Sequence, residues 1–242
     1  MPSILGFMES HANTHYIISA VGVFAILSGF IFMFVRFPLP KNINGFPIRR
    51  SLSLLKDRTL IIVALILFCQ SSFEALVNNW TTTFLSGKTG INSSMALYAL
   101  SLSIVGMTGM RLLMGSFMRN FTAQRVLIIC FVLLGLGCSF LFAQNYTFLL
   151  AGMLFIGAGL AAGFPVMFAI VASKYEDLSA TAISLVLVFA MVGNMLVNYL
   201  AGIVIDQYGA HSLHEMMILE TVLMAALCVL LFWHLKKRAL KV

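Results

Sequence analysis

The sequence predicts an all-α protein, a polytopic membrane helix bundle with about seven transmembrane helices. Two observations lead to this fold class. Hydrophobic residues make up 61% of the chain and charged residues only 10%, which leaves too few polar side chains to cover a soluble domain. The apolar residues also form runs of about 20 residues, the length that a helix needs to cross the hydrocarbon core of a bilayer.

The predicted spans form one helix, a linker and then six closely spaced helices. Three prolines punctuate the only long connection, residues 36–58, and mark it as a cytoplasmic linker. The chain therefore divides into an N-terminal segment with one helix (1–35), this linker, and a six-helix part (59–242). The seven predicted spans are 15–35, 59–85, 93–118, 124–143, 147–172, 180–205 and 215–234.

Positive charges predict how these helices are oriented. If the spans alternate in direction, every Lys and Arg except Lys88 falls on the same side of the membrane. The positive-inside rule makes that side cytoplasmic, so we expect an outer N-terminus and a cytoplasmic C-terminus in a bacterial inner (plasma) membrane. Because the basic residues cluster at the ends of apolar runs, the net charge of +7 does not indicate a nucleic-acid partner.

Polar side chains are distributed unevenly over the last six spans. In the first triplet, span 59–85 carries most of them and span 124–143 has almost none in its middle; span 215–234, the last of the second triplet, is similarly apolar. Since polar side chains in hydrocarbon are costly, we expect the third helix of each triplet to face lipid and the first two to face the interior. Two three-span triplets have opposite topology, which is typical of a transporter half built from a 3+3 inverted repeat.

A stripe of polar side chains marks the second predicted span. Gln70, Glu74 and Asn78 recur every four residues and therefore share one helix face. A charged carboxylate at Glu74, near the middle of the span, costs about 2.5–3.5 kcal/mol, so we expect it to be neutral, hydrogen-bonded or in contact with water. The stripe contacts either a solute or coupling ion, or a neighbouring helix. Asn79 and Trp80 follow it, and the Trp80 ring suits stacking on a sugar or an interfacial aromatic belt.

Two later spans carry further candidate features. In the fifth span, Gly159 and Gly163 form a small-xxx-small pair that permits close helix approach, and Pro165 removes a backbone donor and loosens the helix. A helix interrupted in this way serves as a transport site or hinge, or it reflects packing alone. In the sixth span, Asn194 and Asn198 lie four residues apart on one face, where they either line a cavity or join two helices.

The stretch GMRLLMGSFMRNF, residues 109–121, resembles a cytoplasmic loop motif of the major facilitator superfamily. Arg111, Gly115 and Arg119 match this motif, which joins helices eight and nine in the family. Met118 replaces the usual Asp of the motif, and the charge interaction that this Asp makes is therefore not expected here.

Further runs are similar to the same family. AGIVIDQYG, residues 201–209, resembles the end of its helix eleven, and GAGLAAGFPVMFAI, residues 157–170, resembles helix ten of its sugar carriers. SSFEALVNNWTTTFL, residues 71–85, is similar to helix seven of fucose or glucose/galactose permease-type carriers, which are cation-coupled sugar importers. The resemblance implies the C-terminal half of such a transporter, preceded by helix six and by the central cytoplasmic loop at 36–58.

The resemblance and the polar stripe together predict a secondary active transporter, or its C-terminal part, that moves a small polar solute such as a sugar by alternating access. We expect symport with H⁺ or Na⁺, and we expect the chain to need the missing N-terminal helices or a partner subunit. The candidate substrate-binding residues are Gln70, Glu74, Asn78, Asn79, Trp80, Asn194 and Asn198. The candidates for a role in conformational change are Arg111, Gly115, Arg119, Gly159, Gly163 and Pro165.

The sequence leaves alternative functions open, namely a seven-helix receptor or sensor and a non-transporting membrane scaffold. An enzyme is not expected, because intramembrane catalysis would need paired His or Asp residues and the spans offer Glu74 and Glu220 without such partners. We expect no cofactor and no metal. The HSLHE stretch at 211–215 lacks the HExxH spacing of a zinc protease, and the four cysteines, all within apolar runs, are expected to pack as small apolar side chains.

Overall fold

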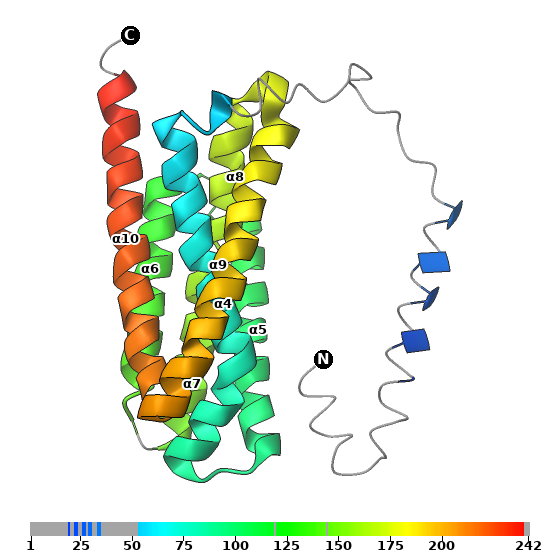
Figure 1. Ribbon diagram of the computed structural model, residues 1–242, viewed down its shortest axis with the longest axis vertical. Helices are drawn as coiled ribbons and strands as arrows, with labels where there is room; N and C mark the ends of the chain where they lie inside the picture. The colour runs from blue at the N-terminus through cyan, green and yellow to red at the C-terminus, as the bar shows by residue number, and fades with distance from the viewer. Residues whose placement is uncertain are drawn as a thin grey trace.

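The computed structural model describes residues 53–118, 120–143 and 145–239, together with isolated helical positions between 19 and 34. Most of the predicted span 15–35 and most of the linker 36–58 lie outside the described residues, and the division of the chain at this linker stays a prediction. The described part is all-helical, which confirms the predicted fold class. Its helices, labelled as in Figure 1, are α4 (Arg58–Thr89), α5 (Ser93–Ser116), α6 (Ala123–Phe140), α7 (Tyr146–Leu160), α8 (Gly163–Lys174), α9 (Ser179–Tyr208) and α10 (Ser212–Ala239), with a short 3₁₀ helix at Glu176–Leu178.

Six spans in the described part are long and apolar enough to cross a membrane. Each corresponds to one of the last six predicted spans, and α7 and α8 together make up the span Tyr146–Lys174. The helices begin where the sequence supplies caps. The Asp57 carboxylate accepts from the Thr59 backbone N–H (2.8 Å) at the start of α4, and Asn145 accepts from the Thr147 N–H (2.9 Å) at the start of α7.

The two triplets of spans interlock in a reciprocal way. Figure 1 shows successive spans running in alternating directions, so that the triplet α4–α6 and the triplet α7–α10 have opposite topology. The first helix of each triplet packs mainly against the second and third helices of the other: α4 against α9 and α10, and the α7 segment against α5 and α6. This exchange of equivalent partners is the arrangement that an inverted repeat produces.

Glycines in α7 permit its close approach to two neighbours at once. A Cβ atom at Gly157 would overlap the Ser103 carbonyl group on α5. A Cβ atom at Gly159 would lie 2.7 Å from the Leu134 Cβ on α6, much closer than van der Waals contact. The α5–α7–α6 packing therefore depends on the absence of side chains at these positions, in keeping with the small residues that membrane helix interfaces favour.

Burial corrects one sequence-based expectation. In the most apolar stretch of each span, 72% of the residues are buried in α4 and 50% in α7–α8, but only 28% in α5, α9 and α10. The first helix of each triplet is therefore interior, as expected. The second helices, α5 and α9, are as exposed as the lipid-facing third helix α10. The reason is their place at the edge of the bundle, where each is covered mainly by one interior helix.

An ion pair joins the end of α8 to the start of α4. The Lys174 ammonium, at the last residue of α8, lies 2.9 Å from Asp57 Oδ2 at the start of α4, and it also donates to the Thr59 hydroxyl. Burial alone would raise the pKa of Asp57. Hydrogen bonds from Lys174, the Thr59 backbone and Tyr175, together with the Lys174 charge, outweigh burial and lower this pKa to about 2.

We predict that Asp57→Asn lowers the free energy of unfolding by about 1–2 kcal/mol at neutral pH, a linkage value reduced because both side chains are partly exposed. Asn is an equally good N-cap, so the change removes the charge and keeps the cap. A depressed pKa stabilises the fold above the unfolded value, so this contribution should disappear as the pH falls from about 4 to about 2.

The measurement is thermal unfolding in detergent as a function of pH. Asp177→Asn is the matched control, because Asp177 is exposed in the connection after α8 at the same end of the bundle. Equal melting temperatures for the two variants at neutral pH would contradict the stabilising role of the Asp57–Lys174 pair.

Candidate functional site

The span Tyr146–Lys174 is interrupted near its middle. Helix α7 ends at Leu160 and α8 begins at Gly163, with Ala161 and Ala162 between them. Pro165 lies in the first turn of α8 and has no N–H, so it cannot donate to the Ala161 carbonyl four residues earlier. Backbone carbonyls released inside a membrane need other donors.

Two side chains from neighbouring helices supply those donors. The Gln70 amide on α4 donates to the Leu160 carbonyl at 2.9 Å, and the Arg111 Nε on α5 donates to the Ala161 carbonyl at 3.4 Å. Gly163 makes room for the first contact, because a Cβ atom there would lie 2.6 Å from the Gln70 Cδ. The break in the span is therefore held by α4 and α5 together.

Glu74 extends this group by one helical turn. Its Oε1 accepts a hydrogen bond from the same Gln70 amide nitrogen (3.2 Å), and Arg111 is close enough to interact with it electrostatically. Glu74 is half-buried, while Gln70 is only 4% exposed. The result is a polar cluster of Gln70, Glu74 and Arg111 around the Leu160 and Ala161 carbonyls, with one basic and one acidic side chain in an apolar bundle.

A second group of polar side chains lies between α4 and α9. The Asn198 side-chain oxygen accepts from Trp80 Nε1 at 2.7 Å and from Asn79 Nδ2 at 3.3 Å. Asn194 donates to the Ser71 carbonyl at 3.3 Å. Trp80 is thus anchored to α9 by its indole N–H, and both asparagines of α9 join two helices.

The remaining predicted site residues are not gathered with these two groups. Asn78 is exposed on α4, one turn beyond Glu74. Gly115 is exposed near the end of α5, Gly159 packs against α6, and Arg119 lies outside the described residues. The structure therefore brings together Gln70, Glu74 and Arg111 at the break, and Asn79, Trp80 and Asn198 at the α4–α9 interface.

The His-rich stretch at 211–215 has a structural environment at the other end of the bundle. His214 is buried, its Nε2 lies 2.9 Å from the Cys138 carbonyl, and its ring meets Phe142 edge-on with centroids 3.9 Å apart. Among the described residues, no group of three or more His, Cys, Asp or Glu side chains is placed to hold a metal ion.

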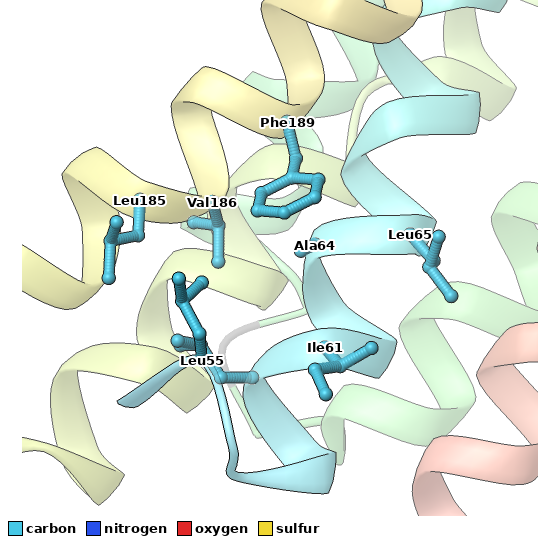
Figure 2. Close-up of a pocket in the computed structure, with 8 residues that line it drawn as sticks. Leu55, Ile61, Ala64, Leu65, Leu185, Val186 and Phe189 are labelled. Carbon is cyan, nitrogen blue, oxygen red and sulfur yellow. The ribbon is translucent and has the colours of Figure 1, made fainter. Parts of the chain in front are cut away.

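An apolar hollow lies between the start of α4 and α9, with a volume of about 290 Å³. Figure 2 shows Leu55, Ile61 and Leu65 on one side of it and Leu185 and Phe189 on the other. Its lining offers no polar side chain, so it is chemically unsuited to hold a small polar solute.

Sequence reasoning missed two features of the interior. It did not foresee that Arg111, expected in a loop motif, reaches the break between α7 and α8. It also gave Glu220 no partner, whereas the structure buries Glu220 against Ser72 of α4, with Glu220 Oε1 2.6 Å from the Ser72 Oγ. Pro165 was the available indication of the first feature, since a proline that frees a carbonyl implies a donor elsewhere.

Comparison with known proteins is consistent with this architecture. The family model described as Major Facilitator Superfamily matches residues 63–241, a stretch that includes nearly all of α4 and continues through α10. No curated protein matches the sequence.

We predict that Gln70→Leu lowers the free energy of unfolding by about 1–3 kcal/mol, because it leaves the Leu160 carbonyl unpaired at similar side-chain volume. Thermal unfolding in detergent is the measurement. Ser101→Ala is the control, since the Ser101 hydroxyl donates to the Leu97 carbonyl of its own helix and, within the described residues, contacts no other helix by a hydrogen bond. If the two variants melt at the same temperature, the Gln70 contact does not hold the break.

Proposed function

The chain belongs to the major facilitator superfamily of membrane transporters, and on this premise we propose that its six described spans form one half of a secondary transporter for a small polar solute. The observation that carries the proposal is the exposure of polar side chains at membrane depth. Asn78 and Asn79 are both exposed roughly 15 Å along α4 from its C-terminal end, and Glu74, near the middle of the helix, is partly exposed. Polar side chains at this depth are costly against lipid and are expected to face water or protein.

This exposed polar surface supports a cavity that a second set of helices would complete. The six described spans leave Asn78 and Asn79 without cover, and α9 next to them adds the partly exposed Asn194 and Asn198. The complementary helices would come from an N-terminal half or from a partner subunit. The solute would then bind between the two sets, near the middle of the membrane.

The break between α7 and α8 supports a role for this span in the conformational change. A helix interrupted at Ala161 and Ala162 can bend there at low cost, because the missing backbone bond has already been replaced by side-chain donors. Arg111 and Gln70 hold the break in its present form, and Glu74 interacts with both of them. Binding of a solute or a cation at Glu74 would therefore act directly on the contacts that hold the break.

The chemistry of the exposed residues favours a sugar, with H⁺ or Na⁺ as the coupling ion. Amide and carboxylate groups such as those of Asn78 and Glu74 can exchange several hydrogen bonds with hydroxyl groups, and Trp80 presents a ring of the kind that stacks on sugars. The similarity of residues 71–85 to fucose or glucose/galactose permease-type carriers points to the same substrate class. Glu74 is the candidate site for the coupling cation.

The distribution of charge supports an orientation. Lys56, Arg58, Arg125 and Lys174 lie at the end of the bundle where α4 begins, whereas Lys88 lies at the opposite end. By the positive-inside rule the first end faces the cytoplasm, here in a bacterial inner membrane. The cavity would then have its Asp57–Lys174 contact on the cytoplasmic side.

We predict that a cysteine at Asn78 reacts with a membrane-impermeant maleimide in lipid vesicles, because this position borders an aqueous cavity. Val222→Cys is the matched control, since Val222 lies at similar depth on α10 and is 61% exposed. The four native cysteines are buried and give a low background. Equal reactivity at the two positions would show that α4 faces lipid here, and the cavity would be excluded.

The transport activity itself is testable by uptake of radiolabelled L-fucose, D-galactose and D-glucose into vesicles under an imposed proton or sodium gradient. We expect uptake when the chain is combined with the N-terminal half of a fucose-type carrier, and none with the chain alone. Glu74→Gln should abolish the dependence on the gradient, while Glu176→Gln, in an exposed connection, should not. Labelling at Asn78→Cys without uptake of any of these sugars would retain the cavity and reject the sugar.

A further inference from the structure

A buried carboxyl group lies on the side of α4 opposite the polar cluster of Gln70, Glu74 and Arg111. Glu220 lies eight residues into α10, about 12 Å along the helix from its start, and is only 7% exposed. Its side chain points to Ser72, which is fully buried on α4. Ser72 is two residues from both Gln70 and Glu74, a rotation of about 200°, so Glu220 meets the face of α4 that points away from the polar cluster.

The protonation state of Glu220 decides which hydrogen-bond donors and acceptors around Ser72 can be paired. The Ser72 Oγ lies 2.6 Å from Glu220 Oε1 and 2.9 Å from the Cys69 carbonyl oxygen. A serine hydroxyl has one proton and can donate to only one of these acceptors. The other oxygen of the carboxyl group, Oε2, is buried and has no hydrogen-bond partner among the described residues.

An ionised Glu220 would therefore be poorly satisfied. At best it would receive one hydrogen bond, and the Cys69 carbonyl would then lose the Ser72 donor. No cation compensates it, since the ion pair found within the described residues, Asp57–Lys174, lies at the start of α4. The titratable groups that face this region are the thiols of Cys69 on α4, of Cys228 farther along α10 next to Cys69, and of Cys138 on α6 beside Thr221, and none of them supplies a positive charge.

We propose that Glu220 is a proton-binding site that holds a neutral carboxylic acid inside the membrane. The acid donates its proton to Ser72 Oγ, and Ser72 donates its own proton to the Cys69 carbonyl. Each donor in this chain then has one acceptor, and only an uncharged carbonyl oxygen of Glu220 stays unpaired, which costs far less than an unpaired carboxylate. The proton thereby joins α10 to α4 on the side away from the solute cavity.

The Glu220 site differs from Glu74 in its hydrogen-bond partners and in its exposure. Glu74 has an amide donor and a nearby guanidinium, and it is partly exposed on the proposed cavity side. Glu220 has one hydroxyl partner and no contact with the break between α7 and α8 among the hydrogen bonds of the described residues. The inference does not require the chain to transport anything, because it rests on the α4–α10 contact alone.

Infrared spectroscopy of the chain at neutral pH, in a detergent without ester groups, tests the proposal through the carbonyl stretch of a protonated carboxylic acid. We expect such a band in the wild type, its loss in Glu220→Gln and its retention in Glu74→Gln. The Gln amide can donate to Ser72 in place of the acid, so this variant should fold. A wild type without the band, or a spectrum from which Glu220→Gln removes no part of the band, would overturn the assignment.

Ser72→Ala provides a second readout in which Glu220 itself is unchanged. Loss of the hydrogen-bond acceptor should move the band to higher frequency, because a carboxylic acid without hydrogen bonds absorbs above one whose hydroxyl group donates a hydrogen bond. Glu74→Gln and Ser101→Ala should leave the frequency where it is. An unchanged frequency in Ser72→Ala would show that the proton of Glu220 is not directed to Ser72.

Discussion

The requirement that every backbone carbonyl inside a membrane find a donor shapes the interior of this protein. Pro165 cannot donate to the Ala161 carbonyl, and Arg111 of α5 donates there instead, while Gln70 of α4 donates to the neighbouring Leu160 carbonyl at the break. Both donors are polar side chains that would otherwise be costly in an apolar bundle. The interruption of one helix and the polar stripe of another therefore stabilise each other, and Glu74 is drawn into the same cluster by the Gln70 amide.

Helix α4 has this central role because it is the most buried span and meets different chemistry on its two sides. One face carries Gln70 and Glu74 toward the break in the neighbouring span, and the opposite face carries Ser72 toward Glu220. The reciprocal packing of the two triplets places α4 between α9 and α10, just as α7 lies between α5 and α6. A displacement of α4 would therefore change the contacts at the break, the contacts of the α9 asparagines with α4, and the contact between Ser72 and the Glu220 carboxyl group on α10.

The sequence was sufficient to predict the spans and their type, because hydrophobic length is a local property that a bilayer imposes on each helix separately. The same holds for the interruption near Pro165, which follows from the covalent structure of proline. The partners across helices were not predictable in this way. The Arg111 contact at Ala161 and the Glu220 contact at Ser72 depend on how helices far apart in the sequence are rotated against one another. For α10, the largely apolar composition gave no indication that Glu220 is buried against Ser72 of α4.

The exposed surface of α9 combines large apolar side chains, which are stable against lipid, with polar amides, which are stable against water or protein. Met195 and Tyr199 are 74% and 67% exposed and would be stable against lipid, whereas Asn194 and Asn198 beside them are partly exposed and polar. Hydrogen bonds to Ser71 and Trp80 use only part of the capacity of the two amides. An amide with unused donors is costly in hydrocarbon and unproblematic next to water or another polar protein surface. The edge formed by α4 and α9 is therefore better matched to a second protein surface enclosing water than to the acyl chains of a bilayer.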